Sequence, residues 1–204
     1  MKVTLSEGFC MNLDIRSDRW AQVNQDFKIL QDILPIKLTR VSAIHNQTKP
    51  SIGTYDTVFK IIIMAKETNL EYVLILEDDL YIIDAEKIKM CLENVPDDWD
   101  MLSAGAYHYT PDIPYNEHWM KMKDFCSMHF VVIRNTIYDK VLGCDKIGHI
   151  DRTIGKMAKN KEINMYLMHP MPCQQRPGFS DLRKGKVDDN KRVLPWIQNE
   201  RTLK

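Results

Sequence analysis

Three adjacent carboxylates, Glu77, Asp78 and Asp79, directly follow an unbroken apolar or aromatic run from Tyr72 to Leu76. Such a run predicts a buried strand, so its end would carry three like charges side by side. A carboxylate near a dry strand end loses free energy unless it has a partner, or else it takes up a proton. We therefore expect a positive partner here. Mg²⁺ or Mn²⁺ would supply one, since both ions prefer oxygen ligands.

Other interpretations of this acidic cluster fit its surroundings less well. A solvated turn tolerates acidic residues, but an apolar strand is typical of the centre of a parallel sheet, whose carboxyl edge borders the ligand crevice. A response-regulator receiver needs a phosphoacceptor aspartate after a later strand, where this chain has Ser103-Ala104-Gly105. A phosphatase with an aspartyl nucleophile needs the pattern Asp-x-Asp-x-Thr, and the threonine is absent.

Short apolar runs alternate with helical patterns along the first half of the chain. This alternation predicts an α/β fold with a Rossmann-like, mostly parallel central sheet flanked by helices. The expected strands span residues 8–13, 36–43, 72–76, 100–103, 127–135 and 164–168. The expected helices run from a cap at Ser17 to Leu30, around 58–65, after a cap at Asp84, and over 136–142 and 151–158. The stretch 107–123, rich in aromatic residues and proline, predicts a loop over the sheet edge.

Composition limits the classes of partner. The chain has 204 residues, enough for one sizeable domain, with 28 basic against 28 acidic residues and therefore no excess of positive charge. We expect no nucleic-acid partner and favour a small polar ligand. No apolar run approaches the length of about 18 residues that predicts a membrane span. The five scattered cysteines favour reduced thiols. We expect a cytoplasmic protein (host cytoplasm if the chain is viral), either a monomer or part of a longer multidomain chain.

Several sequence pieces, taken in order, point to one family. They are "CMNLDIRSDRW", "LTRVSAIHN", "GTYDTVFKIIIMAKETNLEYVLILEDDL", "WDMLSAG", "IDRTIG" and "HPMPCQQRPGFSDL". In this order the chain resembles glycosyltransferases of the GT-A fold. The resemblance is strongest to the lipopolysaccharide-type and collagen-galactosyl-type enzymes of glycosyltransferase family 25, including relatives encoded by large DNA viruses. It covers about residues 9 to 182. One departure is Thr57-Val58, where the family often has Ser-His.

The resemblance implies transfer of a hexose-type sugar from a nucleoside diphosphate donor, UDP above all, to a hydroxyl of a glycan or glycoconjugate. It implies Mn²⁺ or Mg²⁺ held by Asp79, with Asp78 assisting directly, through water or at the ribose, while Glu77 is structural. His169, after the last expected strand, is a candidate third ligand, or else a surface histidine before a proline turn.

The resemblance also implies a donor pocket at the ends of the first two strands. Its expected residues are Leu13, Asp14, Arg16, Arg19, Arg40 and Ala43, although Arg19 could instead pair with a local acid and Arg40 could instead be structural. If the anomeric configuration inverts, one carboxylate must take the proton of the acceptor hydroxyl. Asp151 is the candidate, and its alternative role is to stabilise a helix N-terminus.

Domain limits and the acceptor side depend on weaker patterns. We expect one GT-A domain over residues 1–182, and a peripheral helix or linker over 183–204. Tyr107, His108 and Trp119 are candidate platforms for a sugar ring, or else a small local core. Two other functions remain open: a nucleotide-sugar-binding domain without turnover, and a nucleotidylyltransferase. The second would need a glycine-rich loop after the first strand, and "NLDIRSDRW" has no glycine.

Overall fold

An eight-stranded sheet forms the centre of the protein, in the strand order β2-β1-β3-β8-β5-β9-β7-β6. The structure is a computed structural model and describes residues 1–106, 110–181 and 183–188. The strands of the sheet are β1 (Glu7–Asn12), β2 (Lys37–Ser42), β3 (Tyr72–Glu77), β5 (Met101–Ser103), β6 (Thr110–Pro114), β7 (Trp119–Asp124), β8 (Phe130–Arg134) and β9 (Met165–Met168).

The sheet contains both parallel and antiparallel strand pairs. β1 pairs in parallel with β2 and β3, and β5 pairs in parallel with β9. β8 lies antiparallel between β3 and β5, and the last pairs, β9 with β7 and β7 with β6, are antiparallel as well. The predicted α/β architecture with a mostly parallel, Rossmann-like central sheet is confirmed.

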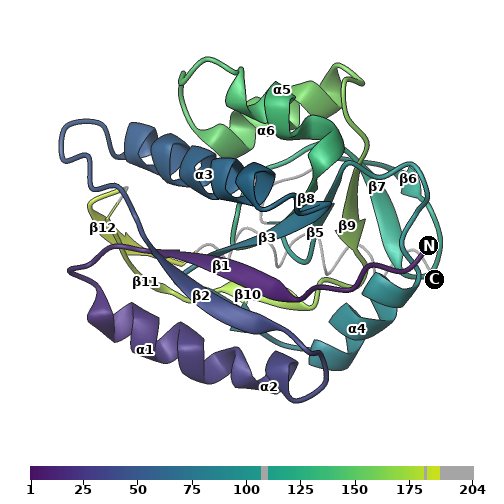
Figure 1. Ribbon diagram of the computed structural model, residues 1–204, viewed down its shortest axis with the longest axis horizontal. Helices are drawn as coiled ribbons and strands as arrows, with labels where there is room; N and C mark the ends of the chain where they lie inside the picture. The colour runs from purple at the N-terminus through teal and green to yellow at the C-terminus, as the bar shows by residue number, and fades with distance from the viewer. Residues whose placement is uncertain (107–109, 182, 189–204) are drawn as a thin grey trace.

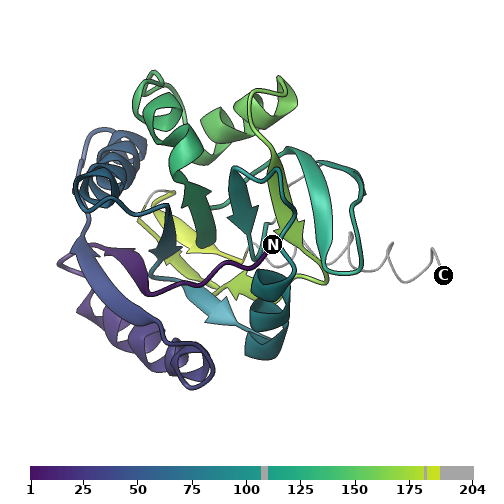
Figure 2. The same ribbon diagram turned by 45° about the vertical axis from the view of Figure 1, so that its right-hand side comes forward.

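Helices cover both faces of the sheet (Figures 1 and 2). One face carries α3 (Pro50–Glu67), α5 (Tyr138–Leu142) and α6 (Ile150–Lys159), with the short 3₁₀ turn Asn135–Ile137 before α5. The other face carries α1 (Ser17–Asp26), α2 (Lys28–Gln31) and α4 (Ala85–Glu93). Among the described residues, no helix combines the length and the apolar content that crossing a membrane requires.

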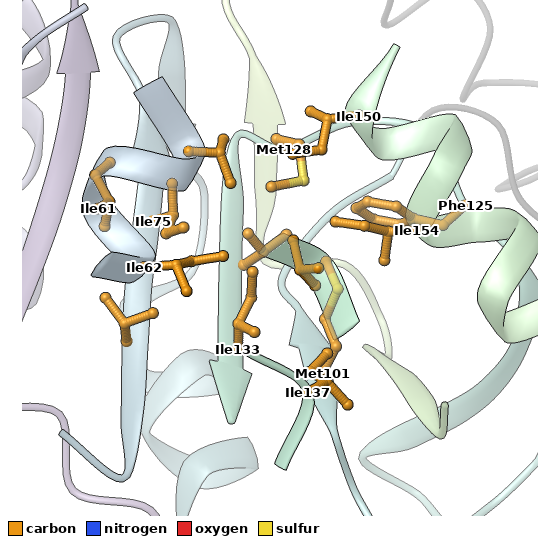
Figure 3. Packing of buried hydrophobic residues seen from close by; sticks show 14 of the residues in the cluster. Ile61, Ile62, Ile75, Met101, Phe125, Met128, Ile133, Ile137, Ile150 and Ile154 are labelled. Atoms are coloured by element: carbon orange, nitrogen blue, oxygen red, sulfur yellow. The ribbon is translucent and has the colours of Figure 1, made fainter. Parts of the chain in front are cut away.

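The central strand β3 explains why the sheet can be covered on both faces. Val73 and Ile75 point into the cluster that includes α3 and α6, whereas Leu74 and Leu76 point into the cluster that includes α1 and α4. Figure 3 shows Ile75 packed against Ile61 and Ile62 of α3. A strand buried on both faces must be apolar at every position, which is why residues 73–76 are an unbroken apolar run.

The loop expected over residues 107–123 was wrong for residues 110–123, the part of this stretch that the structure describes. β6 and β7 form an antiparallel pair at the sheet edge, with a shifted register at Pro111 and Pro114. Proline is tolerated at an edge strand or a bulge because a ladder hydrogen bond is not needed there, so these prolines did not exclude a strand. Tyr107 and His108 lie outside the described residues. Trp119 is fully buried and donates its indole N–H to the carbonyl of Asn94 at 2.9 Å, so it is not a sugar platform.

Helix starts were predicted with mixed success. The Asp84 carboxylate accepts a hydrogen bond from the Lys87 backbone N–H at 2.9 Å, which confirms it as the cap of α4. Ser17 is the first residue of α1 rather than its cap, and the cap position is taken by Arg16. The expected single helix to Leu30 is divided into α1 and α2 at Phe27.

Two small antiparallel pairs complete the structure. β4 (Leu80–Ile82) pairs with β10 (Cys173–Gln175), and β11 (Gly178–Ser180) pairs with β12 (Gly185–Val187). The hairpin formed by β11 and β12 extends on both sides of the expected boundary at residue 182. Residues 189–204 lie outside the described part of the chain, so the division into a domain and a tail stays a prediction.

Gly53 of α3 allows the helix to approach the segment after β2 very closely. A Cβ atom at this position would lie 2.2 Å from the backbone oxygen of Ile44. Thr57, one turn later, joins the same two segments: its hydroxyl accepts from the Ile44 N–H at 2.9 Å and donates to the Gly53 carbonyl at 2.7 Å. Thr57 therefore has a structural role at the position where the resembled family often has serine.

We predict that Gly53→Ala lowers the free energy of unfolding by about 2 kcal/mol, because the added methyl group must displace backbone atoms. A glycine-to-alanine change inside a helix ordinarily gains about 0.5–1 kcal/mol, so the clash reverses the sign. Urea unfolding measures the change. Gly185→Ala is the matched control, since its nearest contact would be 3.9 Å away, and it should change stability by less than about 0.5 kcal/mol. Equal stability of the two variants would contradict the close approach.

Candidate functional site

A cavity of about 470 Å³ opens where β1, β2 and β3 end. Its walls come from the ends of these strands, the starts of α3 and α6, and the β11–β12 hairpin, which lies beside the end of β1 in Figure 1. Of the residues expected at a site, the lining includes Leu13, Arg19, Ala43, Asp78, Asp79 and Asp151. Segments that are far apart in the sequence therefore meet at the carboxyl edge of the sheet, where parallel sheets bind ligands.

Protein groups partner each of the three adjacent carboxylates. Asp78 accepts from the Arg19 guanidinium at 2.9 Å and from the side-chain amide of Asn12 at 2.7 Å. Asp79 lies 3.6 Å from the same guanidinium nitrogen. The Gln175 amide lies 2.8 Å from a Glu77 oxygen and 3.3 Å from an Asp79 oxygen. Asp78 thus has both oxygens engaged at close range, whereas the contacts of Asp79 are longer.

Burial and mutual repulsion raise the pKa values of two of these groups. Burial is the largest cause for Glu77, and the nearby charges of Asp79, Asp151 and Asp78 add to it, so its pKa lies well above the ordinary range. Burial and then the charge of Asp78 raise the pKa of Asp79 to about 6, although Arg19 opposes the shift. The cluster therefore carries unmet negative charge, which favours a cation.

Asn12 links the carboxylate cluster to the end of β2. This buried side chain accepts from the Arg40 guanidinium at 2.7 Å and donates to Asp78 and to the Arg16 carbonyl. Arg40 also contacts Asp14 at 2.7 Å, and that bond, after the stronger effect of the Ser42 hydroxyl, lowers the pKa of Asp14. Sequence reasoning did not single out Asn12. The available signal was a polar residue at the end of an otherwise buried strand.

Two of the three arginines expected at the donor, Arg16 and Arg19, contact the β11–β12 hairpin. Arg16 contacts Asp181 at 2.7 Å and also pairs with Asp18, and these hydrogen bonds raise the pKa of its guanidinium. Arg19 donates to the backbone carbonyl of Phe179 at 2.5 Å while it contacts Asp78. Arg19 thus pairs with Asp78 and Arg40 with Asp14, and the contacts of both arginines with a donor stay a prediction.

Asp151 lies in the first turn of α6 and lines the same cavity as Asp79. One of its oxygens accepts from the Ser127 backbone N–H at 3.0 Å and from the Cys126 thiol at 3.2 Å. Its other oxygen accepts from the Arg152 N–H at 2.8 Å. The cap position of α6 itself is His149. Asp151 is therefore a cavity carboxylate with defined partners, and its catalytic role stays a prediction.

His169, expected as a third metal ligand, lies away from the carboxylate cluster at the end of β3. It is not among the cavity-lining residues, and its backbone N–H donates to the His118 carbonyl at 2.9 Å. The reason is the strand order: β8 and β5 separate β9 from β3, so the end of β9 lies about 14 Å across the sheet, three spacings of about 4.8 Å. The chain then returns through β10, and Gln175 rather than His169 reaches Asp79.

The carboxylate oxygens of the cluster suit a hard divalent cation that uses few protein ligands. No group of three or more histidine, cysteine or acidic side chains with metal-binding geometry occurs within residues 1–106, 110–181 and 183–188. Mg²⁺ commonly uses one or two carboxylates and completes its shell with water and substrate phosphates. Asp79, whose oxygens have only long contacts, fits this requirement, and the raised pKa of Asp79 indicates where positive charge is lacking.

Several solved structures with a similar fold are described as transferases. A glycosyltransferase involved in the glycosylation of the major capsid of PBCV-1 superposes with a TM-score of 0.59 at 9% identity, covering 92% of this chain and 98% of that chain. The present chain therefore has the GT-A fold. A mutant Drosophila β-1,4-galactosyltransferase 7 in complex with manganese, UDP-Gal and xylobiose gives 0.52 at 7% identity, covering 93% and 74%.

A mannose-1-phosphate geranyltransferase from Thermus thermophilus also superposes, with a TM-score of 0.50 at 10% identity over 84% of this chain and 76% of that chain. No family model and no curated protein matches the sequence. At these identities the likeness shows the fold alone.

We predict that Asp79→Asn raises the free energy of unfolding near pH 7 but has little effect near pH 4. With its folded pKa raised to about 6, Asp79 binds a proton more tightly in the folded protein than in the unfolded chain. Its contribution to stability is therefore present at pH 4 and is lost as the pH rises through 6. The difference between the two pH values should be about 1–2 kcal/mol, reduced from the full shift because the side chain is 22% exposed.

Urea unfolding at the two pH values, with a chelator present, measures this difference. Asp139→Asn is the matched control, because that carboxylate is 85% exposed on α5 and pairs with Lys66. Its effect should be small at both pH values, because an exposed ion pair contributes little to stability. An Asp79→Asn variant that is less stable than the wild type at pH 7 would contradict the charge imbalance.

Proposed function

We propose that the protein is a metal-dependent glycosyltransferase. It moves a hexose-type sugar from a nucleoside diphosphate donor, UDP above all, to a hydroxyl group of a glycan or glycoconjugate, with inversion at the anomeric carbon. One observation carries the proposal: a single cavity at the carboxyl edge of a GT-A sheet holds Asp79, Arg19 and Asp151 together. The ordered motifs favour membership of glycosyltransferase family 25.

The strand ends would hold the donor. Leu13 and Ala43 line the cavity and offer apolar surface to a base, and Asp14 and Arg40 form a polar pair just beyond them. Asp78, which Arg19 and Asn12 keep in place, would meet the ribose or a bound water. The guanidinium groups of Arg16 and Arg19 would contact the diphosphate, since planar guanidinium groups pair well with phosphate oxygens.

Asp79 would hold Mn²⁺ or Mg²⁺ together with the donor phosphates, and the ion would supply the positive charge that stabilises the departing diphosphate. Arg19 lies within reach of both Asp78 and Asp79, so it can add charge at the same place. Gln175 keeps the Glu77 side chain turned toward the cluster, and Glu77 has a structural role.

Asp151 would act as the general base. It lies in the same cavity as the metal carboxylate, and its oxygens are oriented by the N–H groups of Ser127 and Arg152. A base in this position takes the proton from an acceptor hydroxyl as that oxygen attacks the anomeric carbon. A single carboxylate is enough for an inverting transfer, because no covalent sugar intermediate forms.

We predict that UDP with Mn²⁺ raises the melting temperature of the protein more than either compound alone. A ligand that binds only the folded state stabilises it by mass action, by about 2.7 kcal/mol at a hundred times its dissociation constant. Asp79→Asn should lose the part of the shift that depends on the metal, and Asp139→Asn should keep it. GDP and dTDP in the same assay test the choice of base. Absence of a shift with every nucleotide would overturn the proposal.

We predict that Asp151→Asn lowers kcat for donor hydrolysis or sugar transfer by about 10²-fold, the usual contribution of a positioned general base. Binding of UDP with Mn²⁺ should change by less than about threefold, because Asp151 does not contact the donor in this proposal. Asp145→Asn, an exposed carboxylate shortly before α6, is the control and should keep full activity. Undiminished turnover in Asp151→Asn would mean that another group takes the proton.

The same assays distinguish the proposed transferase from the alternative, a nucleotide-sugar-binding domain without turnover. That alternative expects metal-dependent UDP binding that depends on Asp79, but neither transfer nor hydrolysis of any UDP-sugar by the wild type. Detectable hydrolysis that disappears in Asp79→Asn would exclude it.

A further inference from the structure

Ser127, which holds the proposed base, has an unusual backbone conformation. Its φ angle is +122°, a region that residues with a side chain rarely adopt, and the residue is buried. Conformations of this kind persist only where the surroundings hold them, and they cluster at functional sites. In this conformation the Ser127 N–H donates to the carboxylate of Asp151, and the Ser127 hydroxyl bonds to Nδ1 of His129.

His129 has no room to move. Its side chain is buried, and a Cβ atom on Gly105 would lie 2.3 Å from Nε2 of the ring and 2.5 Å from the Cys173 carbonyl oxygen. The Cys173 backbone also interacts with the ring and opposes the lowering of the imidazole pKa. The other ring nitrogen, Nδ1, contacts the Ser127 hydroxyl.

Met128, which lies between Ser127 and His129 in the sequence, anchors the segment 127–129 in the hydrophobic core. Met128 packs beside Ile150, the first residue of α6, in the core cluster shown in Figure 3. Asp151 is the next residue of that helix. The segment 127–129 is thus held by the core through Met128 and by the imidazole through Ser127, and both contacts bear on the start of α6.

A nucleophilic role for Ser127 with His129 as its base fits this geometry poorly. Burial lowers the pKa of the imidazole to about 4, so the ring resists taking a proton. Its second nitrogen is enclosed beside Gly105, away from the cavity carboxylates that could take up a proton. A neutral, immobile imidazole is instead well suited to hold a hydroxyl in one place.

We propose that His129 and Ser127 are positioning residues for Asp151. His129 holds the Ser127 hydroxyl, this contact keeps the Ser127 backbone in its rare conformation, and that conformation directs the N–H at the carboxylate. The inference rests on the proposed function, in which Asp151 takes the acceptor proton. It adds two residues that act through Asp151.

Two substitutions at His129 separate the hydrogen bond from the packing. The amide of asparagine can take the place of Nδ1, whereas that of glutamine reaches toward Nε2. We expect His129→Gln to lower kcat by about 10-fold or more, since small misplacements of a catalytic group cost up to about 10²-fold. His129→Asn should stay within about threefold of the wild type. Binding of UDP with Mn²⁺ should change by less than about twofold in both, because the donor contacts are elsewhere.

Amide hydrogen exchange of Ser127, followed by NMR, tests the contact without any activity. Exchange should be at least about tenfold faster in His129→Gln than in the wild type, and nearly unchanged in His129→Asn, because opening of the local structure controls exchange. If the wild type transfers and hydrolyses no sugar, the proposed function fails, and the exchange rates still decide whether His129 holds Ser127.

A glycine at position 127 tests whether His129 positions the Ser127 backbone or only fills space in the core. Glycine adopts this backbone region without steric cost, so Ser127→Gly/His129→Gln should recover part of the kcat that His129→Gln loses. If His129 only fills space, the loss persists with glycine. Ser127→Ala, which removes only the hydroxyl, carries the test if the His129 variants do not fold, and it should show the same loss of kcat and faster exchange. Unchanged exchange and kcat in Ser127→Ala and His129→Gln would overturn the inference.

Discussion

Repulsion among three carboxylates at the end of β3 is the constraint on which the rest of the site depends. β3 is buried on both faces, so Glu77, Asp78 and Asp79 follow a dry strand and little water is available to screen their charge. The raised pKa values of Glu77 and Asp79 are the measure of this imbalance. The fold answers it by bringing donors from distant segments: Asn12 from β1, Arg19 from α1, and Gln175 from β10. None of these partners is a neighbour of the cluster in the sequence.

The same partners connect the cluster to the edges of the cavity. Arg19 reaches both Asp78 and the backbone of β11, and Arg16 reaches Asp181 in the turn of that hairpin. The cavity therefore carries its positive charge on side chains that already have acidic or carbonyl partners. A diphosphate bound there would compete with these acceptors for the arginines and would add negative charge, which is a second reason to expect a cation at the same place. On the opposite wall, Asp151 is oriented by the turn before β8 and does not depend on these arginines.

Several elements were predictable because their signals are local. The helix that follows β4 has its cap at Asp84, and the strand over residues 73–76 is apolar at every position because both faces are covered. The hairpin of β6 and β7 was missed because Pro111 and Pro114 argue against a strand, and only the position at a sheet edge makes them acceptable. His169 was expected beside Asp79 because it follows β9, the last strand of the large sheet along the sequence. The strand order puts the end of β9 far from β3, and this order cannot be deduced from local signals.

The sequence by itself determined that strands and helices alternate, that a buried strand ends in three carboxylates, and that these would need positive charge. Burial, strand period and charge repulsion act over a few residues, so they can be deduced from the order of side chains. Only the tertiary structure decided which groups supply the charge, that Gln175 rather than His169 meets Asp79, and that Ser127 and His129 orient Asp151. Those contacts depend on strand order and on the approach of distant backbone segments, and hydrogen bonds form only where that packing brings donor and acceptor within about 3 Å.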